Sequence, residues 1–285
     1  MTETANNLSV LPVYRLFAYF LGIWYIYYRG DKMSKENLMI QKQLNHRTIR
    51  EFKNESIPTE IFEKLIEVAR RTPTSNGMQS STIIRVTDPE KKKAIAEVCR
   101  QEYVARAPEL LIFLADAYRN YRIAEEKGYN GSGARDMDRF FQGFTDACLT
   151  AQNIVNGAEA MDLGAVYLGS ILNDAEKIIE ILELPELTMP VVGLGIGYPN
   201  QNPQLKPRMD MKLRLFENTY EKFDNYLEEI KEYDEDIQTY YDLREANKRV
   251  DSFSNQVVTK LVNLIPKRSD MVNIMEKQGF DLNLE

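Results

Sequence analysis

The sequence has 285 residues, 44% of them hydrophobic, which is enough for one large domain or two small ones with a sizeable core. Its net charge of −7 argues against a general nucleic-acid binder, because such a protein carries a basic face. A single histidine, His46, excludes a histidine-rich metal site, and two cysteines without a CxxC spacing exclude a zinc site of their own. Cys99 and Cys148 indicate a reducing, cytoplasmic compartment, and we expect both thiols in the core.

The first 32 residues differ from the rest of the chain. Leu11 to Tyr28 is an aromatic-rich apolar run of 18 residues, interrupted by Arg15, and its length permits a membrane helix. Three interpretations are open: a membrane anchor, an extra helix packed on the body, or translated sequence upstream of a start at Met33. We favour the third and expect no membrane association, because the globular pattern begins only after Met33.

After Met33 the chain alternates between helix and strand patterns. In chain order we predict a helix over 60–71, a strand over 82–86, a helix over 88–102, a strand over 109–115, a helix over 138–161, a strand over 164–168, a helix over 174–182 and a strand over 189–198. The tail, from Lys212, has the composition of an extended arm and ends in helices over 257–264 and 270–279. This order predicts one domain of the α/β or α+β class.

A phosphate-binding pattern stands at the start of this region. His46-Arg47-Thr48-Ile49-Arg50 places two arginines, a histidine and a hydroxyl within five residues. The planar guanidinium group suits phosphate oxygens. In an extended segment, His46, Thr48 and Arg50 would point to one side. The alternative is a solvated, charged turn.

Two further basic clusters lie near the C-terminus. Lys206-Pro207-Arg208 is a stiff patch that suits a phosphate or negative charge developing on a cofactor ring. Arg244 and Arg249 form a cluster that suits the 2′-phosphate of NADPH. A solvated loop and charge pairing on a helix surface are the respective alternatives.

Three uncharged segments complete the candidate set. Thr72–Gln79 carries hydroxyls and amides that can bind a polar ring or a ribityl chain. Tyr167–Ser170 ends a predicted strand, and its Gly169 permits close approach of a ligand to the backbone. The alternatives are an ordinary connection and a turn glycine. The glycines of 193–197 form GxGxG inside a strand, not GxGxxG opening a helix, so a Rossmann fold is disfavoured.

Taken in this order, the segments resemble the NADPH-dependent branch of the nitroreductase superfamily, the oxygen-insensitive nitroreductases and FMN reductases. The resemblance covers Met33 to the C-terminus and rests on residues 46–52, 78–81, 101, 151–153, 158–159, 163–170, 202–208 and 240–249. It implies an α+β fold, with helices wrapped around a central sheet of mixed strands, in an intertwined homodimer. Residues 33–285 would form a single FMN-binding domain with a C-terminal helical arm, and residues 1–32 an apolar extension without a family counterpart.

The resemblance also assigns roles to individual residues. FMN would be held at its phosphate and ribityl end by His46, Arg47, Thr48 and Arg50, at its ribityl chain or ring by Thr74 and Gln101, along its isoalloxazine by Tyr167, Leu168, Gly169 and Ser170, and electrostatically by Lys206 and Arg208. NADPH would be bound through Arg244 and Arg249. Thr74 stands where the family often has serine, and Ser170 where it commonly has a second glycine.

The implied activity is hydride transfer from NADPH, through FMN, to nitro compounds, quinones or free flavin by a ping-pong mechanism, without a catalytic side chain or a metal. The sequence does not separate these acceptors. The alternative from another functional class is an FMN-binding module with a flavin-supply or sensing role and little turnover. The pair Arg244 and Arg249 argues against it, because such a module needs no NADPH site.

Overall fold

The computed structural model describes residues 38–242 and 248–282, and the chain divides into two units, residues 1–45 and 46–285. In the first unit, residues 38–44 are helical. The apolar run Leu11–Tyr28, with its three interpretations, lies outside the described residues. Within the described ranges, no helix has both the length and the apolar character needed to cross a bilayer.

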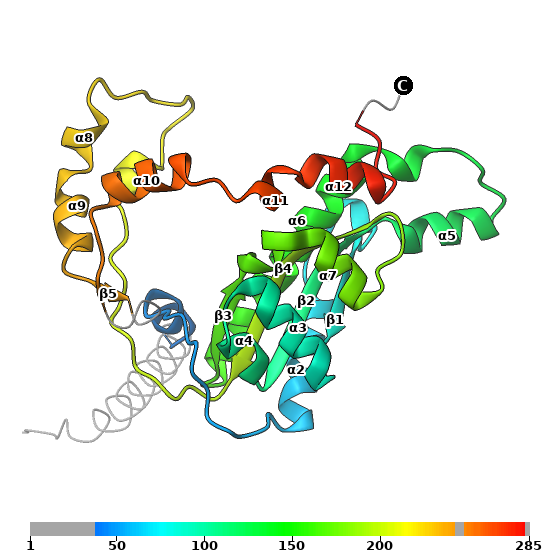
Figure 1. Ribbon diagram of the computed structural model, residues 1–285, viewed down its shortest axis with the longest axis horizontal. Coiled ribbons are helices and arrows are strands. Elements are labelled where there is room, and N and C mark those ends of the chain that lie inside the picture. The colour runs from blue at the N-terminus through cyan, green and yellow to red at the C-terminus, as the bar shows by residue number, and fades with distance from the viewer. Residues whose placement is uncertain (1–37, 243–247, 283–285) are drawn as a thin grey trace, which may run out of the picture. The chain divides into compact units, whose positions relative to one another are not determined.

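A four-stranded sheet in the order β1-β2-β4-β3 forms the centre of the second unit (Figure 1). The strands are β1 (Ser81–Arg85), β2 (Glu109–Asp116), β3 (Gly164–Leu168) and β4 (Thr188–Gly197), close to the predicted bounds. Neighbouring strands pair antiparallel. Thr48 forms a parallel bridge with Ala165 of β3, so the sheet has both antiparallel and parallel pairing. The α+β fold expected from the sequence is therefore confirmed.

Helices cover both faces of the sheet, which explains why β2 is buried along its whole length. One core is formed with α2 (Thr59–Arg70) and α6 (Met137–Ala160), and the other with α3 (Pro89–Cys99), α4 (Tyr103–Arg106) and α7 (Ala175–Leu182). Because successive side chains of a strand point to opposite faces, β2 contributes to both cores. Its odd residues 111, 113 and 115 join the first core, and its even residues 110, 112 and 114 the second.

The helix predicted over 88–102 is shorter in the structure, because α3 ends at Cys99 and the separate helix α4 begins only at Tyr103. Asp88 caps the start of α3 by accepting a hydrogen bond from the backbone N–H of Glu90, at 2.8 Å. The helix ends at Cys99 because Arg100 adopts a left-handed conformation, with φ of 55°. The short α4 then follows, and this turn brings Gln101 to the sheet face that carries the second core.

After β4 the chain forms a series of short elements. They are η4 (Met211–Leu213), α8 (Tyr226–Glu229), α9 (Lys231–Ile237), β5 (Tyr241–Asp242), β6 (Lys248–Arg249), α10 (Phe253–Val262), α11 (Pro266–Ser269) and α12 (Met271–Lys277). On α12, Ile274 and Met275 are buried in the first core. The arm therefore ends by packing against the main domain.

The two cysteines differ in position. Cys99 is buried in the second core, as expected. For Cys148 the expectation of a core position is wrong, because this residue is exposed on α6. It belongs to an outward stripe of that helix with Phe144 and Leu149, which are 40% and 47% exposed. A helix with apolar residues on more than one face does not reveal from its sequence which face is the inner one.

Candidate functional site

Residues 46–53 are tied through their backbone to β3 at one end and to the chain just after β4 at the other. The N–H of Ile49 donates to the carbonyl of Ala165 at 3.0 Å, and the N–H of Lys53 donates to the carbonyl of Tyr198 at 2.8 Å. Ile49 is buried, and a Cβ placed on Gly164 would come within 2.6 Å of its side chain. The missing side chain at Gly164 therefore lets this segment approach the sheet.

Two basic segments that are distant in the sequence, residues 46–50 and 203–208, line one cavity of about 160 Å³. Nine described residues line it, and none of them is acidic: His46, Arg47, Thr48, Arg50, Pro203, Gln204, Lys206, Arg208 and Tyr240. The side-chain nitrogen of Lys206 lies 5.8 Å from the ring centroid of Tyr240. Four basic side chains thus share a small cavity with a histidine and a hydroxyl. Ile49 is buried in the core. Arg47 lines the cavity together with His46, Thr48 and Arg50, so the segment does not follow the strict alternation expected from the sequence.

His46 is held in place from α6. Its Nδ1 lies 2.5 Å from Oε1 of Glu159, whose side chain is 11% exposed. The carboxylate fixes the orientation of the imidazole ring. Residues 158–159 belong to the segments that resemble the family, but the contact of Glu159 with His46 could not be predicted, because the two are 113 residues apart in the chain.

A second group of predicted residues lies at the end of β3, beside the cavity. The hydroxyl of Tyr167 donates to Oε1 of Gln152 at 3.1 Å, and the hydroxyl of Ser170 donates to Oε1 of Gln101 at 2.9 Å. Gln152 and Glu159 are seven residues apart on α6, so the two groups lie about 10 Å apart along that helix. Burial raises the pKa of the Tyr167 phenol well above its ordinary value, so this hydroxyl stays protonated.

Gly169 leaves open space in this group. A Cβ placed on it would meet nothing within 4 Å. Its carbonyl accepts a hydrogen bond from Nη1 of Arg268, at 3.0 Å, so α11 holds this turn in position. The neighbouring Leu168 is 1% exposed. Its side chain packs in the core, and only its backbone can face a ligand.

The buried thiol of Cys99 lies behind Ser170. Burial raises the pKa of this thiol, and a hydrogen bond with Ser170 partly offsets that effect. The thiol of Cys99 is therefore neutral at physiological pH. Because only the thiolate is a good nucleophile, this residue is not a reactive one.

Thr74 lies apart from both groups. It lines a different cavity of about 440 Å³, together with Gly77 and Gln79, at the β1 side of the sheet. β1 and β3 are the outer strands, with β2 and β4 between them. Three strand spacings amount to about 14 Å. One copy of the chain therefore does not bring Thr74 to the basic cavity.

The predicted NADPH residues are only partly described. Arg244 lies outside the described residues. Arg249 belongs to β6, where its backbone pairs with Tyr241. The 2′-phosphate assignment is therefore still a prediction.

The chemistry of the basic cavity fits the phosphate end of FMN. Several like charges gathered at one place repel each other, so a bound anion stabilises the arrangement. Arginine, lysine and hydroxyl donors are the groups that bind phosphate oxygens. The cavity is smaller than the roughly 300–1,000 Å³ of pockets that hold drug-sized ligands. It has room for a phosphate but not for a whole flavin, whose ring would have to extend toward the open space at Gly169.

Comparison with known families agrees with this geometry. The model of the nitroreductase family matches residues 44–198, and that of the nitroreductase family C-terminal domain matches residues 206–283. The chain belongs to the nitroreductase family. The resemblance seen in the sequence is confirmed, and the second match includes the helical arm.

Several bacterial proteins resemble this chain over most of their length. A Bacillus subtilis protein named FMN reductase (NADPH) is 34% identical over 250 residues, which are 87% of this chain and 100% of the relative. A Salmonella typhimurium protein named oxygen-insensitive NADPH nitroreductase is 34% identical, over 85% of this chain and 97% of its own. The solved structure of the NfrA1 nitroreductase from B. subtilis has a TM-score of 0.79 at 33% identity, and covers 86% of this chain and 100% of its own.

Proposed function

We propose that this member of the nitroreductase family binds FMN and catalyses the NADPH-dependent reduction of nitroaromatic compounds, quinones or free flavin in the cytoplasm. The observation that carries the proposal is the cavity in which Arg47, Arg50, Lys206 and Arg208 meet His46 and Thr48. The relatives named FMN reductase (NADPH) and oxygen-insensitive NADPH nitroreductase support the choice of cofactor and electron donor.

The residues of this chain would bind and orient the cofactor. The basic cavity would hold the phosphate, and Gln101, Tyr167, Gly169 and Ser170 would line the ring. When bound, FMN would supply the hydride chemistry between NADPH and the acceptor. Lys206 and Arg208 would add positive charge at the phosphate end of the cofactor, which strengthens binding of that anion. Gly169 leaves space for a flat molecule, because nothing lies within 4 Å of the position that a Cβ would take there.

A homodimer would complete this site. Thr74 lies at the β1 side of the sheet and the basic cavity at the β3 side, so we infer that the Thr74 loop of one copy serves the FMN of the other. Apolar residues are exposed on two helices, as is typical of a surface that a second copy covers. They are Phe141, Phe144 and Leu149 on α6 and Val258, Leu261 and Val262 on α10.

Steady-state kinetics test the proposed turnover. If NADPH and the acceptor use one site in turn, double-reciprocal plots at several acceptor concentrations will be parallel. Intersecting plots would contradict the ping-pong mechanism. A protein that binds FMN tightly but oxidises NADPH with none of the three acceptor classes would instead be an FMN-binding module.

The preference for NADPH is tested with the two predicted arginines. Arg244→Ala and Arg249→Ala should each raise the KM for NADPH about tenfold, as expected for loss of a charge-assisted contact, and leave the KM for NADH unchanged. Lys64→Ala, an exposed change on α2, is the control. An equal effect on both nucleotides would remove the 2′-phosphate role.

A further inference from the structure

The loop between α2 and β1 has an unusual backbone. It contains η1 (Ser75–Gly77), and two residues with side chains, Asn76 and Gln79, adopt left-handed conformations with φ of 51° each, beside Gly77 at 70°. Residues with side chains avoid this region. Such a conformation persists only where surrounding contacts hold it.

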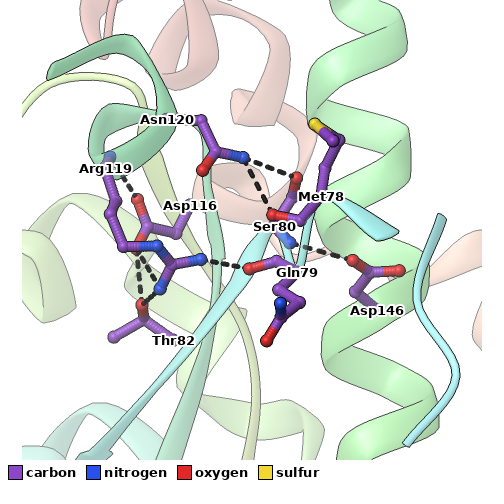
Figure 2. Close-up of polar contacts among 8 residues, drawn as sticks. All are labelled: Met78, Gln79, Ser80, Thr82, Asp116, Arg119, Asn120 and Asp146. Atoms are coloured by element: carbon purple, nitrogen blue, oxygen red, sulfur yellow. Dashed lines mark hydrogen bonds and ion pairs between the residues drawn. The ribbon is translucent and has the colours of Figure 1, made fainter. Parts of the chain in front are cut away.

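A buried carboxylate on α6 holds both ends of this loop. Asp146 is 0% exposed, and its two oxygens accept hydrogen bonds from the backbone N–H of Ser75 at 2.8 Å and of Ser80 at 2.9 Å. Figure 2 shows the contact with Ser80. Gly143, one turn earlier on α6, allows this close approach, because a Cβ there would lie 2.6 Å from the carbonyl oxygen of Ser80.

Two side chains of α5 (Tyr118–Glu126) hold the same loop from the other side (Figure 2). Asn120 donates from Nδ2 to the carbonyl of Met78 at 3.0 Å and to the hydroxyl of Ser80 at 3.3 Å. Arg119 donates to the carbonyl of Gln79.

Arg119 is itself oriented by β1 and β2. Its Nη1 lies 3.2 Å from Oγ1 of Thr82 and 3.7 Å from Oδ2 of Asp116. Asp116 also accepts a hydrogen bond from the backbone N–H of Arg119, at 3.0 Å. The contact with the loop is therefore one part of a connected network.

These contacts leave one side of the loop available. Gly77, Gln79 and Ser81 line the 440 Å³ cavity with Thr74, whereas Met78 and Ser80 face an opposite cavity of about 320 Å³ with Asn120. The contacts from α5 and α6 are made to backbone atoms of the loop and to the side chain of Ser80. Thr74 and Gln79 line the 440 Å³ cavity, and a hydroxyl and an amide suit the polar edge of a flat ring.

We propose that Asp146, Arg119 and Asn120 are positioning residues, which hold the loop so that Thr74 and Gln79 contact bound FMN. This inference rests on the proposed function and extends it to side chains that do not themselves line the basic cavity. None of these three residues was among the site residues predicted from the sequence. A signal for Asp146 was present, because an acidic residue lies among buried small residues of α6.

The test replaces Asp146 with Asn in the full chain. The amide nitrogen of Asn cannot accept a hydrogen bond, so one loop contact and the charge are lost. Hydrogen exchange at Ser75 and Ser80 should become about tenfold faster, and the Kd for FMN should rise about tenfold, with an altered visible circular dichroism of the bound flavin. Asp138→Asn, an exposed change on the same helix, should alter none of these.

A second variant removes the contact that Arg119 of α5 makes with the loop. Arg119→Met should give the same three changes, and Arg122→Met, an exposed arginine of α5 paired with Glu125, is its control. Arg119→Met also serves if Asp146→Asn does not fold.

The outcomes separate the two proposals. A wild-type chain that takes up no FMN would remove the proposed function and, with it, the flavin role of the loop. A wild-type chain that binds FMN while both variants bind it equally well, with unchanged flavin circular dichroism, would overturn only the positioning role. Faster exchange without either flavin change would make the network purely structural.

Discussion

His46, with its Nδ1 2.5 Å from Glu159, is oriented by a carboxylate outside the basic cavity that it lines. The neighbouring Arg47 and Arg50 come from the same segment, whereas Lys206 and Arg208 come from the chain after β4. A phosphate bound in this cavity would contact two segments that are distant in the sequence and meet only in the fold. Single side chains can therefore be tested for their share of cofactor affinity.

Arg50→Gln should weaken FMN binding. A hydrogen bond to a charged group contributes about 1.5–3 kcal/mol, so the Kd should rise about 10- to 100-fold. Quenching of FMN fluorescence on titration measures this. Arg106→Gln removes an exposed arginine that pairs with Glu51 at 2.9 Å, and should leave the Kd unchanged. Equal Kd values for the two variants would argue against a phosphate at the basic cavity.

At this scale the sequence predicted the members of the cavity but not their supports. His46, Arg47, Thr48 and Arg50 are adjacent in the chain, so their composition is visible directly. Gln152 and Glu159 lie on a helix and meet Tyr167 and His46 only after folding. No local pattern encodes such contacts.

Among the secondary-structure elements, α6 organises the site. Along one helix, Asp146 holds the loop before β1, Gln152 contacts Tyr167, and Glu159 contacts His46. Both α6 and β3 were predicted from the sequence, because helical and strand periodicities are strong there. The interruption at Arg100 was not, since a left-handed residue other than glycine leaves little trace in a sequence.

Substitutions of Gly164, the first residue of β3, and of Gly169, the residue after β3, should differ in their effect on stability. Gly164→Ala should lower the free energy of unfolding by about 1–3 kcal/mol, because the new Cβ overlaps Ile49 and overpacking has this cost. Gly169→Ala is the matched control and should leave it unchanged, since nothing lies within 4 Å. Urea unfolding measures both. Equal stability of the two variants would mean that residues 46–50 do not pack closely on β3.

The outward stripe of α6 predicts an effect on assembly. Leu149→Glu places a charge in the proposed dimer interface, so the protein should become monomeric and retain less FMN. Light scattering after gel filtration, with the flavin absorbance of the same peak, measures both. Lys64→Glu, on the exposed side of α2, should remain dimeric. A monomeric wild-type protein would contradict the interface and leave Thr74 without a role in flavin binding.

For the whole molecule, the matched family models begin at residue 44 and end at residue 283. A chain that starts at Met33 should therefore bind FMN and turn over NADPH within about twofold of the full chain, as expected for a region that the fold does not need. Comparison of membrane and soluble fractions for both chains tests the anchor interpretation. Recovery of only the full chain with membranes would support an anchor.

In the proposed reaction, bound FMN takes electrons from NADPH. The most direct measurement is the visible spectrum of the purified protein without oxygen, before and after addition of NADPH and, separately, of NADH. We predict flavin bands that bleach rapidly with NADPH and slowly with NADH. A protein that takes up FMN but is bleached by neither nucleotide would contradict the proposed reaction, and a colourless protein that takes up no FMN would contradict the assignment of the basic cavity as well.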